Sequence, residues 1–535
     1  MRKKYVKKGN HRSLDDYIYA KTGKHISQLD KYKSYYYLTL IPYIAQKIMT
    51  AIRLGKKIIV YADYDCDGIT SACEFSLILD SLGATYTIKV PKRFTDGYGV
   101  KKKFTTTLGP DCLLILVDNG IAAIEAIAEA KRKGAEVIVM DHHMAVNNKG
   151  NIILPNADLL LDPEALPEGN DFTDYCGAGL TYKLAQYMLK DQTLIDHCTA
   201  LAALGTIADM VPLHEDNRQI VTNGLSLINK GNATVGLQTL IQKLEYSGHV
   251  SSETVSFYIA PILNASGRLY DEGATWSALT LLESDYQKAL NMADVLMNVN
   301  KSRKEIVSRI LDSIYIDPHD KVNVIATPAE SPVGCLGLVA GKITEETKRT
   351  TFVYSNVNGI YKGSARSDDE NFNHVKNMLD SISEYFIAYG GHPGAAGFSF
   401  DPKYEPIIRE KLLNYPVIPH DMTPYYDLDL QCKDIDTTLE ELDKCEPFGK
   451  GLEKPTFAMN CHFNSDYYWK ACGKDGEHIM FTIPGTNYKA IAFHMKDEYM
   501  RDGMPKNVRF IGNLNWNYYG GKKIPQFLID DYEIC

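Results

Sequence analysis

Three short apolar segments in the first third of the chain each run directly into acidic residues. The segments are "KKIIVYA" (56–62), "CLLILV" (112–117) and "AEVIVM" (135–140), and the residues that follow are "DYDCDG" (63–68), "DNG" (118–120) and "DHH" (141–143). Short, β-branched apolar runs are typical of buried strands. The segment "AAIEAIAEAKRKG" (122–134) between the last two has helical spacing and ends in glycine. Alternating strands and helices predict parallel βαβ units in an α/β fold.

The order of these elements predicts where the acidic side chains meet. In open parallel sheets, ligands bind beyond the carboxyl ends of the strands, so Asp63, Asp118 and Asp141 should converge on one edge. A further acidic position lies in "AALGTIADMVPL" (202–213), an apolar helical segment that places Asp209 beside Pro212. An aspartate near a helix end is, by itself, more typical of a helix cap. Asp209 therefore joins the predicted site only because three other acidic clusters precede it.

A calcium loop is the alternative interpretation of the first acidic cluster. "DYDCDGITSACE" (63–74) fits the EF-hand pattern D-x-[DN]-x-[DN]-G-x5-E at every position. An EF-hand loop must have a helix on each side, whereas the segment before Asp63 has the pattern of a strand. The spacing of Ile69, Cys73 and Leu77 predicts a helix that already contains Glu74. The pattern thus favours a strand, an acidic turn and a helix over a calcium sensor.

The residue types favour hard divalent cations. Carboxylates with one or two imidazoles and no thiolate suit Mn²⁺ or Mg²⁺ better than structural zinc. Enough acidic ligands are present to hold two ions about 3.5 to 4 Å apart, with Asp118 or a neighbour between them. Such a pair serves the hydrolysis of phosphoesters. The plainer interpretation of "DHH" alone is a capped strand end with solvent-facing histidines.

Length and composition set the frame for this site. A chain of 535 residues with 45% hydrophobic and 23% charged residues is expected to form several globular domains. It has no apolar run of about 18 residues, and its basic N-terminus lacks the apolar core of a secretion signal, so we expect a cytoplasmic protein without membrane contact. The 11 cysteines include no CxxC pair, which favours free thiols over zinc or disulfides.

The charge distribution allows a nucleic-acid partner despite a net charge of −9. Basic residues gather in "KVPKRFTDGYGVKKK" (89–103) and in residues 2–12, although a solvated face or a loose tail explains such runs equally well. Phosphates are commonly met by arginine, serine and backbone amides. Candidate stretches are the predicted turn "LNASGRL" (263–269), the segment "KGSARS" (362–367) and the glycine-rich loop "YGGHPGAAGFSF" (389–400).

Taken in order, these motifs resemble a known family. "DYDCDG", "VDNG", "DHH" and "GTIADMVPL" look like the motifs of the DHH phosphoesterase superfamily. "APILNASGRL", "GSARS" and "GGHPGAAGF" are similar to later motifs of its RecJ branch, which comprises single-strand-specific exonucleases. The resemblance runs from about residue 50 to the C-terminus. Cys66 departs from the alanine that is common there, and Pro332 lies in a looser version of a His-Gly-Val-x-Gly stretch.

The resemblance implies roles for individual residues. The implied metal ligands are Asp63, Asp65, Asp67, Asp118, His142 and Asp209. The implied catalytic group is Asp118, His142, His143 and Asp141, in which Asp141 supports the histidines and His143 faces the scissile phosphate. The implied substrate-binding residues are Arg93, Asn264, Arg268, Ser364, Arg366 and His392. Arg93, Arg268, Ser364 and Arg366 would bind the 5′ phosphate end, and His392 would approach the centre from a second domain.

The remaining patterns complete the predicted domain order. We expect a basic, helical N-terminal extension (1–50), a parallel-sheet DHH catalytic domain (51–215), connecting helices (216–312), a second, DHH-associated α/β domain (313–405) and an OB-type β-barrel (406–535). Single-stranded nucleic acid stacks on aromatic side chains in OB folds. Candidates in the barrel are Tyr467, Tyr468, Trp469, Trp516, Tyr518 and Tyr519, although barrel aromatics more often belong to the core.

The expected function is a Mn²⁺- or Mg²⁺-dependent exonuclease that degrades single-stranded DNA from its 5′ end to 5′ mononucleotides, in repair and recombination. The resemblance implies a monomer that works beside a helicase and a single-strand-binding protein. One alternative is a related enzyme acting on oligoribonucleotides, cyclic dinucleotides or pyrophosphate, which would not need the long β-rich C-terminal part. Another is a non-catalytic replication or repair scaffold, which would be expected to have lost ligands.

Overall fold

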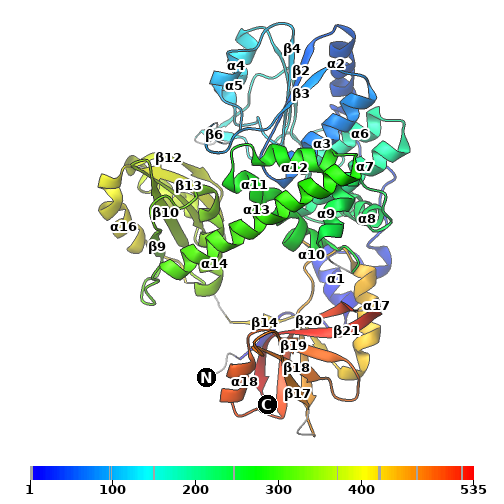
Figure 1. Cartoon of the computed structure of the whole chain (residues 1–535), viewed down its shortest axis with the longest axis vertical. Coiled ribbons are helices and arrows are strands. Elements are labelled where there is room, and N and C mark those ends of the chain that lie inside the picture. The colour runs from blue at the N-terminus through cyan, green and yellow to red at the C-terminus, as the bar shows by residue number, and fades with distance from the viewer. Residues whose placement is uncertain are drawn as a thin grey trace.

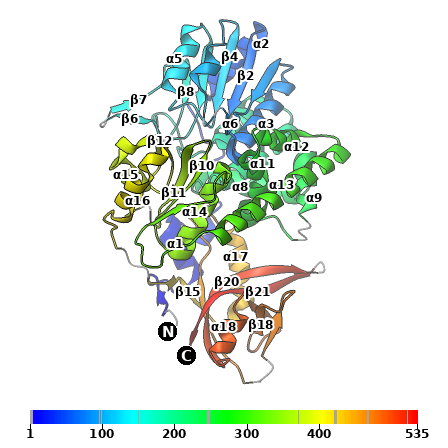
Figure 2. The same ribbon diagram turned by 60° about the vertical axis from the view of Figure 1, so that its left-hand side comes forward.

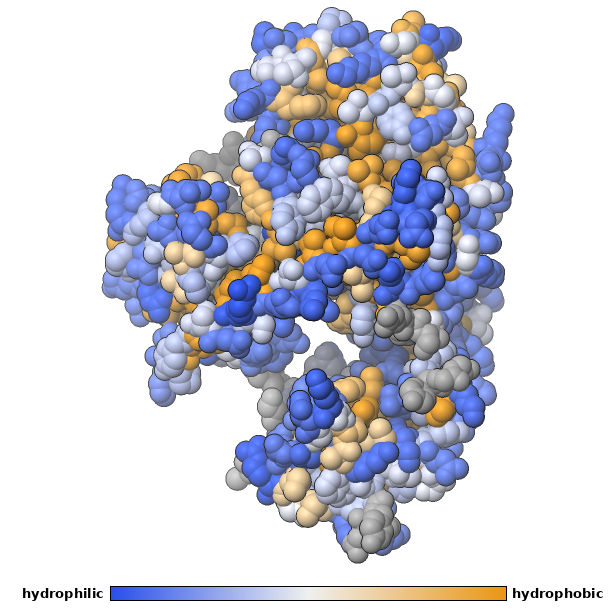
Figure 3. Space-filling view, in the orientation of Figure 1, coloured by the Kyte–Doolittle hydropathy of each residue, from blue (hydrophilic) through white to orange (hydrophobic). Residues whose placement is uncertain are grey.

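The structure is a computed structural model that describes residues 4–95, 97, 99–148, 151–244, 248–369, 371–419, 423–464, 468–519 and 522–535. Figure 1 shows an upper body built from the blue, cyan and green parts of the chain, a yellow-green lobe at its left and an orange and red lobe below. The space-filling view shows an opening between the upper body and the lower lobe (Figure 3).

A five-stranded parallel sheet forms the centre of the upper body. Its order is β3-β2-β4-β5-β8, with bounds Tyr86–Lys89, Lys57–Ala62, Cys112–Val117, Glu136–Met140 and Leu159–Leu161. Alternate strand residues enter two cores, one on each face. The first face is covered by α2 (Ile41–Arg53), α3 (Cys66–Ser81) and α6 (Gly177–Met188), and the second by α4 (Lys102–Thr105) and α5 (Ile124–Arg132). The predicted α/β fold with parallel βαβ units is confirmed.

A hairpin and a group of helices follow. The hairpin is β6 (Val146–Asn148) and β7 (Asn151–Ile153). The helices are α7 (Gln192–Ala208), α8 (Glu215–Asn229), α9 (Val235–Lys243), α10 (Ser252–Thr254), the π-helical turn η2 (Val255–Ile259), α11 (Ala260–Leu269), α12 (Gly273–Leu282) and α13 (Tyr286–Ser313). The predicted turn at 263–269 is wrong, because these residues complete α11. The small side chains of Ala265 and Ser266 and the bare Gly267 are buried there against neighbouring elements.

The second α/β lobe is a mixed sheet of order β12-β13-β11-β10-β9. Its strands are β9 (Asn323–Ala326), β10 (Thr351–Val357), β11 (Ile360–Arg366), β12 (Phe386–Gly391) and β13 (Ala395–Phe400), of which only β9 and β10 are parallel. Its helices are α14 (Val333–Thr347), α15 (Val375–Asp380), η3 (Ser383–Tyr385), η4 (Pro402–Tyr404) and α16 (Glu405–Leu413). Ile408 and Leu412 of α16 belong to this lobe's core, so the predicted boundary at residue 405 cuts through its packing.

The lower lobe is a seven-stranded sheet of order β15-β16-β20-β21-β19-β18-β17. Its elements are β14 (Tyr425–Tyr426), β15 (Leu428–Leu430), η5 (Cys432–Asp434), α17 (Ile435–Cys445), β16 (Phe457–His462), β17 (Trp469–Cys472), β18 (His478–Thr482), β19 (Lys489–Ala492), α18 (Lys496–Arg501), β20 (Asn507–Tyr519) and β21 (Lys522–Ile534). Strands β20 and β21 are long, not short as the sequence predicts. Within the described residues, β15 and β17 stay at the two edges, as in a partly open OB barrel.

The N-terminal segment divides its packing between two lobes. Strand β1 (Val6–Lys7) pairs with β14, and α1 (Leu14–Thr22), followed by η1 (Ile26–Gln28), packs in the core of the lower lobe. Both chain ends therefore lie at that lobe, as Figures 1 and 2 show. By contrast, α2 belongs to the upper body. The predicted separate extension of residues 1–50 does not follow this packing, since its apolar side chains complete two distant cores.

None of the helices that the structure describes is both long and apolar enough to cross a bilayer.

Candidate metal centre and anion site

The register of the parallel sheet brings a row of aspartates to one edge. Ala62 pairs with Val117, Val117 with Met140, and Met140 with Leu161. The next residue on each of these four strands is an aspartate: Asp63, Asp118, Asp141 and Asp162. All four are at most 3% exposed, so the predicted convergence is real and the carboxylates are withdrawn from water.

The last member of this row, Asp162, was not among the predicted site residues. Asp162 follows the short run "LLL" (159–161), whose three residues gave too weak a strand signal to be counted. One of its oxygens accepts a hydrogen bond from the amide of Ala165, and burial raises its pKa to about 7. A fourth apolar run ending in aspartate was the signal that could have found it.

The first acidic loop is held by backbone amides. Asp65 caps α3, and its Oδ1 accepts hydrogen bonds from the amides of Asp67 and Gly68 at 3.1 and 3.2 Å. The two oxygens of Asp67 accept from the amides of Gly177 and Ala178, at the start of α6, at 2.7 and 2.8 Å. Oδ1 of Asp63 is buried and has no hydrogen-bond partner among the described residues. A strand precedes this loop and Glu74 is buried within α3, which excludes an EF-hand.

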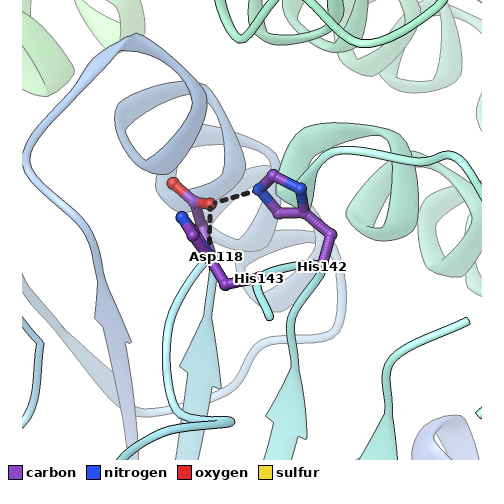
Figure 4. Close-up of side chains that lie close together, drawn as sticks. All are labelled: Asp118, His142 and His143. Carbon is purple, nitrogen blue, oxygen red and sulfur yellow. Dashed lines mark hydrogen bonds and ion pairs between the residues drawn. The ribbon is translucent and has the colours of Figure 1, made fainter. Parts of the chain in front are cut away.

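The two histidines join the remaining carboxylates. His142 Nε2 lies 3.1 Å from Asp118 and 3.7 Å from Asp67, and its Nδ1 lies 3.8 Å from Asp209. His143 Nδ1 is 2.8 Å from Asp141 and 3.9 Å from Asp118. Figure 4 shows both rings turned toward the Asp118 carboxylate, which lies between them. Potential ligand atoms therefore form overlapping groups: Asp63, Asp65 and Asp118; Asp67, His142 and Asp209; and Asp118, His142 and His143.

The buried carboxylates of this centre repel one another, which favours the binding of cations. Burial first, and repulsion between neighbouring carboxylates second, raise the pKa values of Asp63, Asp118 and Asp209 well above normal. Burial lowers the pKa of His142, which favours the neutral ring that binds metals. Burial acts the same way on His143, but its bond to Asp141 outweighs it and raises the pKa to about 9. The oxygen-rich donor set fits hard divalent cations.

Two residues of the centre have strained backbones. Asp118 has φ of 58°, and Met210, directly after Asp209, has the same value. Residues other than glycine seldom adopt this region, and such strain persists only where the surrounding fold imposes it. These turns lie directly after β4, at Asp118 itself, and directly after Asp209, where the chain leaves α7.

Two glycines beside Asp67 were also not predicted to belong to the site. A Cβ on Gly205 of α7 would lie 2.6 Å from Asp67 Oδ1 and 2.6 Å from the Cβ of Ala178, and one on Gly177 would lie 2.6 Å from the Cβ of Asp118. Only bare backbone lets α6 and α7 approach the carboxylates this closely. The run "CGAG" (176–179) carried the only hint.

Gly205→Ala is therefore expected to destabilise the fold by about 1 to 3 kcal/mol through overpacking and to weaken Mn²⁺ binding by displacing Asp67. Urea unfolding and calorimetric titration with Mn²⁺ measure the two effects. Gly341→Ala, in α14, is the matched control, because its Cβ would meet nothing within 4 Å. That change should stabilise the protein by about 0.5 to 1 kcal/mol and leave Mn²⁺ affinity unchanged. Equal behaviour of the two variants would contradict the close approach.

Arginines gather beside the metal centre. The guanidinium of Arg93 lies over the Tyr64 ring, 4.7 Å from its centroid, close enough to influence the charge of Asp63. Burial and then repulsion from Arg93, with smaller contributions from Arg303 and Arg366, lower the pKa of Arg268 to about 10. None of these four arginines forms an ion pair with a carboxylate among the described residues. A cluster of like charges without acidic partners is suited to an anion.

The other predicted substrate residues surround this cluster. Arg366 Nη1 donates to Ser364 Oγ at 3.1 Å, and both residues lie on β11 facing Gly337. Asn264 lies on α11, and its Oδ1 is buried without a partner in the described part of the chain. His392, in the β12–β13 turn of the second lobe, has its Nδ1 3.3 Å from Sδ of Met144, next to His143. Arg303 of α13, which the sequence analysis did not single out, lies near Arg268 and has a buried Nε without a partner among the described residues.

A cavity of about 910 Å³ leads from this region to the lower lobe. Its wall includes Met210 beside Asp209, and the cations Arg268, Arg303, Lys342, Lys450 and Lys454. Arg268 and Arg303 lie on α11 and α13 of the upper body, and Lys342 lies on α14 of the second lobe. Lys450 and Lys454 follow α17. The wall also contains Glu253, Glu453 and many apolar side chains, so the cavity joins the three lobes along a mostly apolar surface with cations among its lining residues.

The aromatic candidates of the lower lobe differ in their availability. Tyr468 is buried and donates to the carbonyl of Met504, so it belongs to the core. The Trp516 indole donates to Asp443, and Lys523 lies over its ring. Trp469 is half-buried against the core, and Tyr518 lies on β20. Tyr467 and the side chain of Tyr519 lie outside the described residues.

Two family models match separate parts of the chain. A model of the DHH family, N-terminal domain, matches residues 57–206, and one of the RecJ OB domain matches residues 426–531. The single-stranded-DNA-specific exonuclease RecJ of Bacillus subtilis is 32% identical over 91% of this chain and 62% of its own length. That of Thermus thermophilus is 30% identical over 88% of this chain and 67% of its own. The chain belongs to the RecJ family.

Solved RecJ structures share the fold as a whole. RecJ of Thermus thermophilus in complex with Mn²⁺ superposes with a TM-score of 0.80 at 28% identity, covering 97% of this chain and 75% of that one. Its complex with Mg²⁺ gives a TM-score of 0.75. This chain spans 62% of the length of the Bacillus subtilis protein and 67% of that of the Thermus thermophilus protein.

Proposed function

We propose that the chain is a metal-dependent exonuclease that hydrolyses single-stranded DNA from the 5′ end and releases 5′ mononucleotides. The observation that carries this proposal is the position of a buried acidic and histidine centre beside arginines that form no ion pair with a carboxylate within the described part of the chain. Related proteins with the name single-stranded-DNA-specific exonuclease support the choice of substrate. Structures of a relative with Mn²⁺ and with Mg²⁺ support the choice of metal.

Each part of the centre has a separate task in this proposal. The residues that would hold the ions are Asp63, Asp65, Asp67, Asp118, His142 and Asp209, and the amides of Gly177 and Ala178 fix Asp67 at the start of α6. When bound, the ions supply Lewis acidity for water attack and for departure of the leaving oxygen. Asp141 engages His143 Nδ1 at 2.8 Å and raises the pKa of the ring to about 9, so the protonated imidazole would act as a hydrogen-bond donor toward a phosphate oxygen.

The arginines would fix the end of the strand. Arg93, Arg268 and Arg366 offer forked donors for the terminal phosphate, and Ser364 adds a hydroxyl. A strand that ends in this pocket presents its first phosphodiester bond to the metal centre, which accounts for 5′ polarity. His392 and Asn264 would border the strand from the second lobe and from α11.

Arg268→Gln should lower the preference for 5′-phosphorylated over 5′-hydroxyl strands by roughly 10- to 100-fold, because one charge-assisted contact is worth about 1.5 to 3 kcal/mol. Competition between the two labelled strands in one reaction measures this ratio. Lys101→Gln, an exposed change in the basic segment 89–103, is the control and should leave the ratio unchanged. An unchanged ratio in Arg268→Gln would place the terminal phosphate elsewhere.

The direct test uses single strands that carry a label at either end. With Mn²⁺ present, a 5′ label should appear at once as mononucleotide, while a 3′ label should stay on progressively shorter strands. Excess chelator should stop both reactions. Release of the 3′ label first, or cleavage unaffected by chelator, would overturn the proposal.

The cellular setting is part of the proposal. The enzyme would act as a cytoplasmic monomer in repair and recombination, beside a helicase that opens duplexes and a protein that coats single strands. The proposed domains are a catalytic domain at 51–215, a helical connector at 216–312 and a second domain that begins at 313. This second domain includes α16. Light scattering of the purified chain tests the monomer.

A further inference from the structure

Two cysteines lie opposite each other in the lower lobe, where β15 gives way to α17. Strands β15 and β16 are parallel, and their register pairs Leu430 with Met459. Two positions further along the two segments are Cys432 and Cys461. Side chains alternate between the faces of a strand, so both cysteines share the side of Leu430 and Met459, which is the buried side.

The spacing allows a bond between the two sulfurs. Cys432 Sγ lies 3.8 Å from the carbonyl oxygen of Asn460, the residue before Cys461. Neighbouring strands are about 4.8 Å apart, and disulfides join Cα atoms about 4.4 to 6.8 Å apart. Side chains of both residues pack in the same core, so no rearrangement of the sheet is needed.

The two thiols differ in a way that gives each a role. Cys432 is partly exposed at the start of a helix, whereas Cys461 is buried. Hydrogen bonding with Cys461 lowers the pKa of Cys432 to about 7, although burial acts in the opposite direction. An accessible thiolate beside a second thiol is the arrangement of redox-sensing cysteines.

We propose that Cys432 and Cys461 form a reversible disulfide when the protein meets a peroxide. The Cys432 thiolate attacks one peroxide oxygen, the O–O bond breaks, and a sulfenic acid forms as hydroxide or alkoxide leaves. Cys461 Sγ then attacks the Cys432 sulfur, the S–O bond breaks, and the hydroxyl leaves with the thiol proton as water. The two thiols lose two electrons and the peroxide gains them. A dithiol reductant reverses the bond.

The position of the bond indicates what it would restrain. The loop that it closes contains α17 and the segment 446–454. The carbonyls of Glu446 and Pro447 accept hydrogen bonds from Arg218, and the cavity is lined by Phe448, Gly449, Lys450, Glu453 and Lys454. The metal centre lies outside this loop. Oxidation would therefore restrain the part of the cavity wall that would face bound DNA, and it would leave the metal ligands unchanged.

The test treats the full chain with one equivalent of hydrogen peroxide, blocks the remaining thiols with an alkylating agent and maps peptides by mass spectrometry. The expected product is a cross-linked pair of peptides containing Cys432 and Cys461, which dithiothreitol separates. In Cys461→Ser, Cys432 should instead be trapped as sulfenic acid by dimedone. In Cys432→Ser, Cys461 should stay reduced, because it is buried.

Cys472 gives the matched control, since it is also partly exposed in this lobe and burial raises its pKa. Cys472→Ser should form the cross-link as the unaltered chain does. After oxidation, limited proteolysis within 446–456 should slow in the unaltered chain and in Cys472→Ser, but not in Cys432→Ser. Oxidation of Cys472 before Cys432, or accumulation of Cys432 sulfinic acid without the cross-link, would overturn the proposal. None of these results depends on nuclease activity.

Discussion

Asp118→Ala is expected to reduce strand hydrolysis by at least about a thousand-fold while leaving strand binding close to normal. Asp118 takes part in two of the overlapping ligand groups, and His142 lies 3.1 Å from it, so its loss disturbs every neighbouring ligand. The anion site is built from Arg93, Arg268, Ser364 and Arg366 and does not use this side chain. Single-turnover cleavage in Mn²⁺ and fluorescence anisotropy with a labelled strand measure the two quantities.

Asp118→Asn separates this effect from a loss of folding. A carboxyl group whose pKa is raised on folding destabilises the folded chain at pH values above its ordinary pKa of 3.8. In chelator at neutral pH, the asparagine variant should therefore melt at a higher temperature than the unaltered chain. It should also lose most of the stabilisation that Mn²⁺ gives. Cleavage retained by either variant would contradict the central place of Asp118.

Arg218→Ala should lower the free energy of unfolding by about 3 to 5 kcal/mol and loosen the lower lobe. Arg218 is only 2% exposed, and its guanidinium donates to the carbonyls of Cys445, Glu446 and Pro447 at 2.8 to 3.0 Å. It also reaches Asp30, which follows η1. Its removal leaves several buried acceptors without donors. Urea unfolding and proteolysis within 446–456 report the change.

Lys523→Ala is the comparison for this variant. Lys523 also binds an acidic residue of the lower lobe, Asp443, at 2.8 Å, but both side chains are about two-fifths exposed. Exposed ion pairs are worth roughly 0.2 to 1 kcal/mol, so its loss should fall within that range. If the two variants were equally stable, the buried Arg218 contacts would not be what holds the lobe.

The catalytic fold was predictable because its signals are local. Each strand of the parallel sheet is a continuous apolar run, and the aspartate that follows marks its carboxyl end, so the row at Asp63, Asp118 and Asp141 could be derived without coordinates. Asp209 could be assigned only through the three acidic clusters that precede it, since one aspartate at a helix end has many ordinary explanations.

The errors share a different cause, which is packing between distant segments. The segment 263–269 contains residues typical of turns, yet α11 forms because Gly267 and its small neighbours fit against Tyr64 and Ala274. Gly205 and Gly177 look unremarkable until two helices meet at Asp67. Arg303 stands in an ordinary charged helix, and only the fold brings it to Arg268. Such residues are selected by what lies opposite them, which one sequence does not disclose.

The division of the N-terminal segment has a consequence for how this chain is made. Tyr17 packs in the lower lobe and donates its hydroxyl proton to the carbonyl of Glu453, which is 436 positions further along. At a synthesis rate of about 5 to 20 residues per second, roughly 20 to 90 seconds separate their exits from the ribosome. During that time Leu14, Tyr17 and Ile18 have no core to enter. The nascent chain therefore offers chaperones an apolar helix early, and the lower lobe can close only after β21 has left the ribosome.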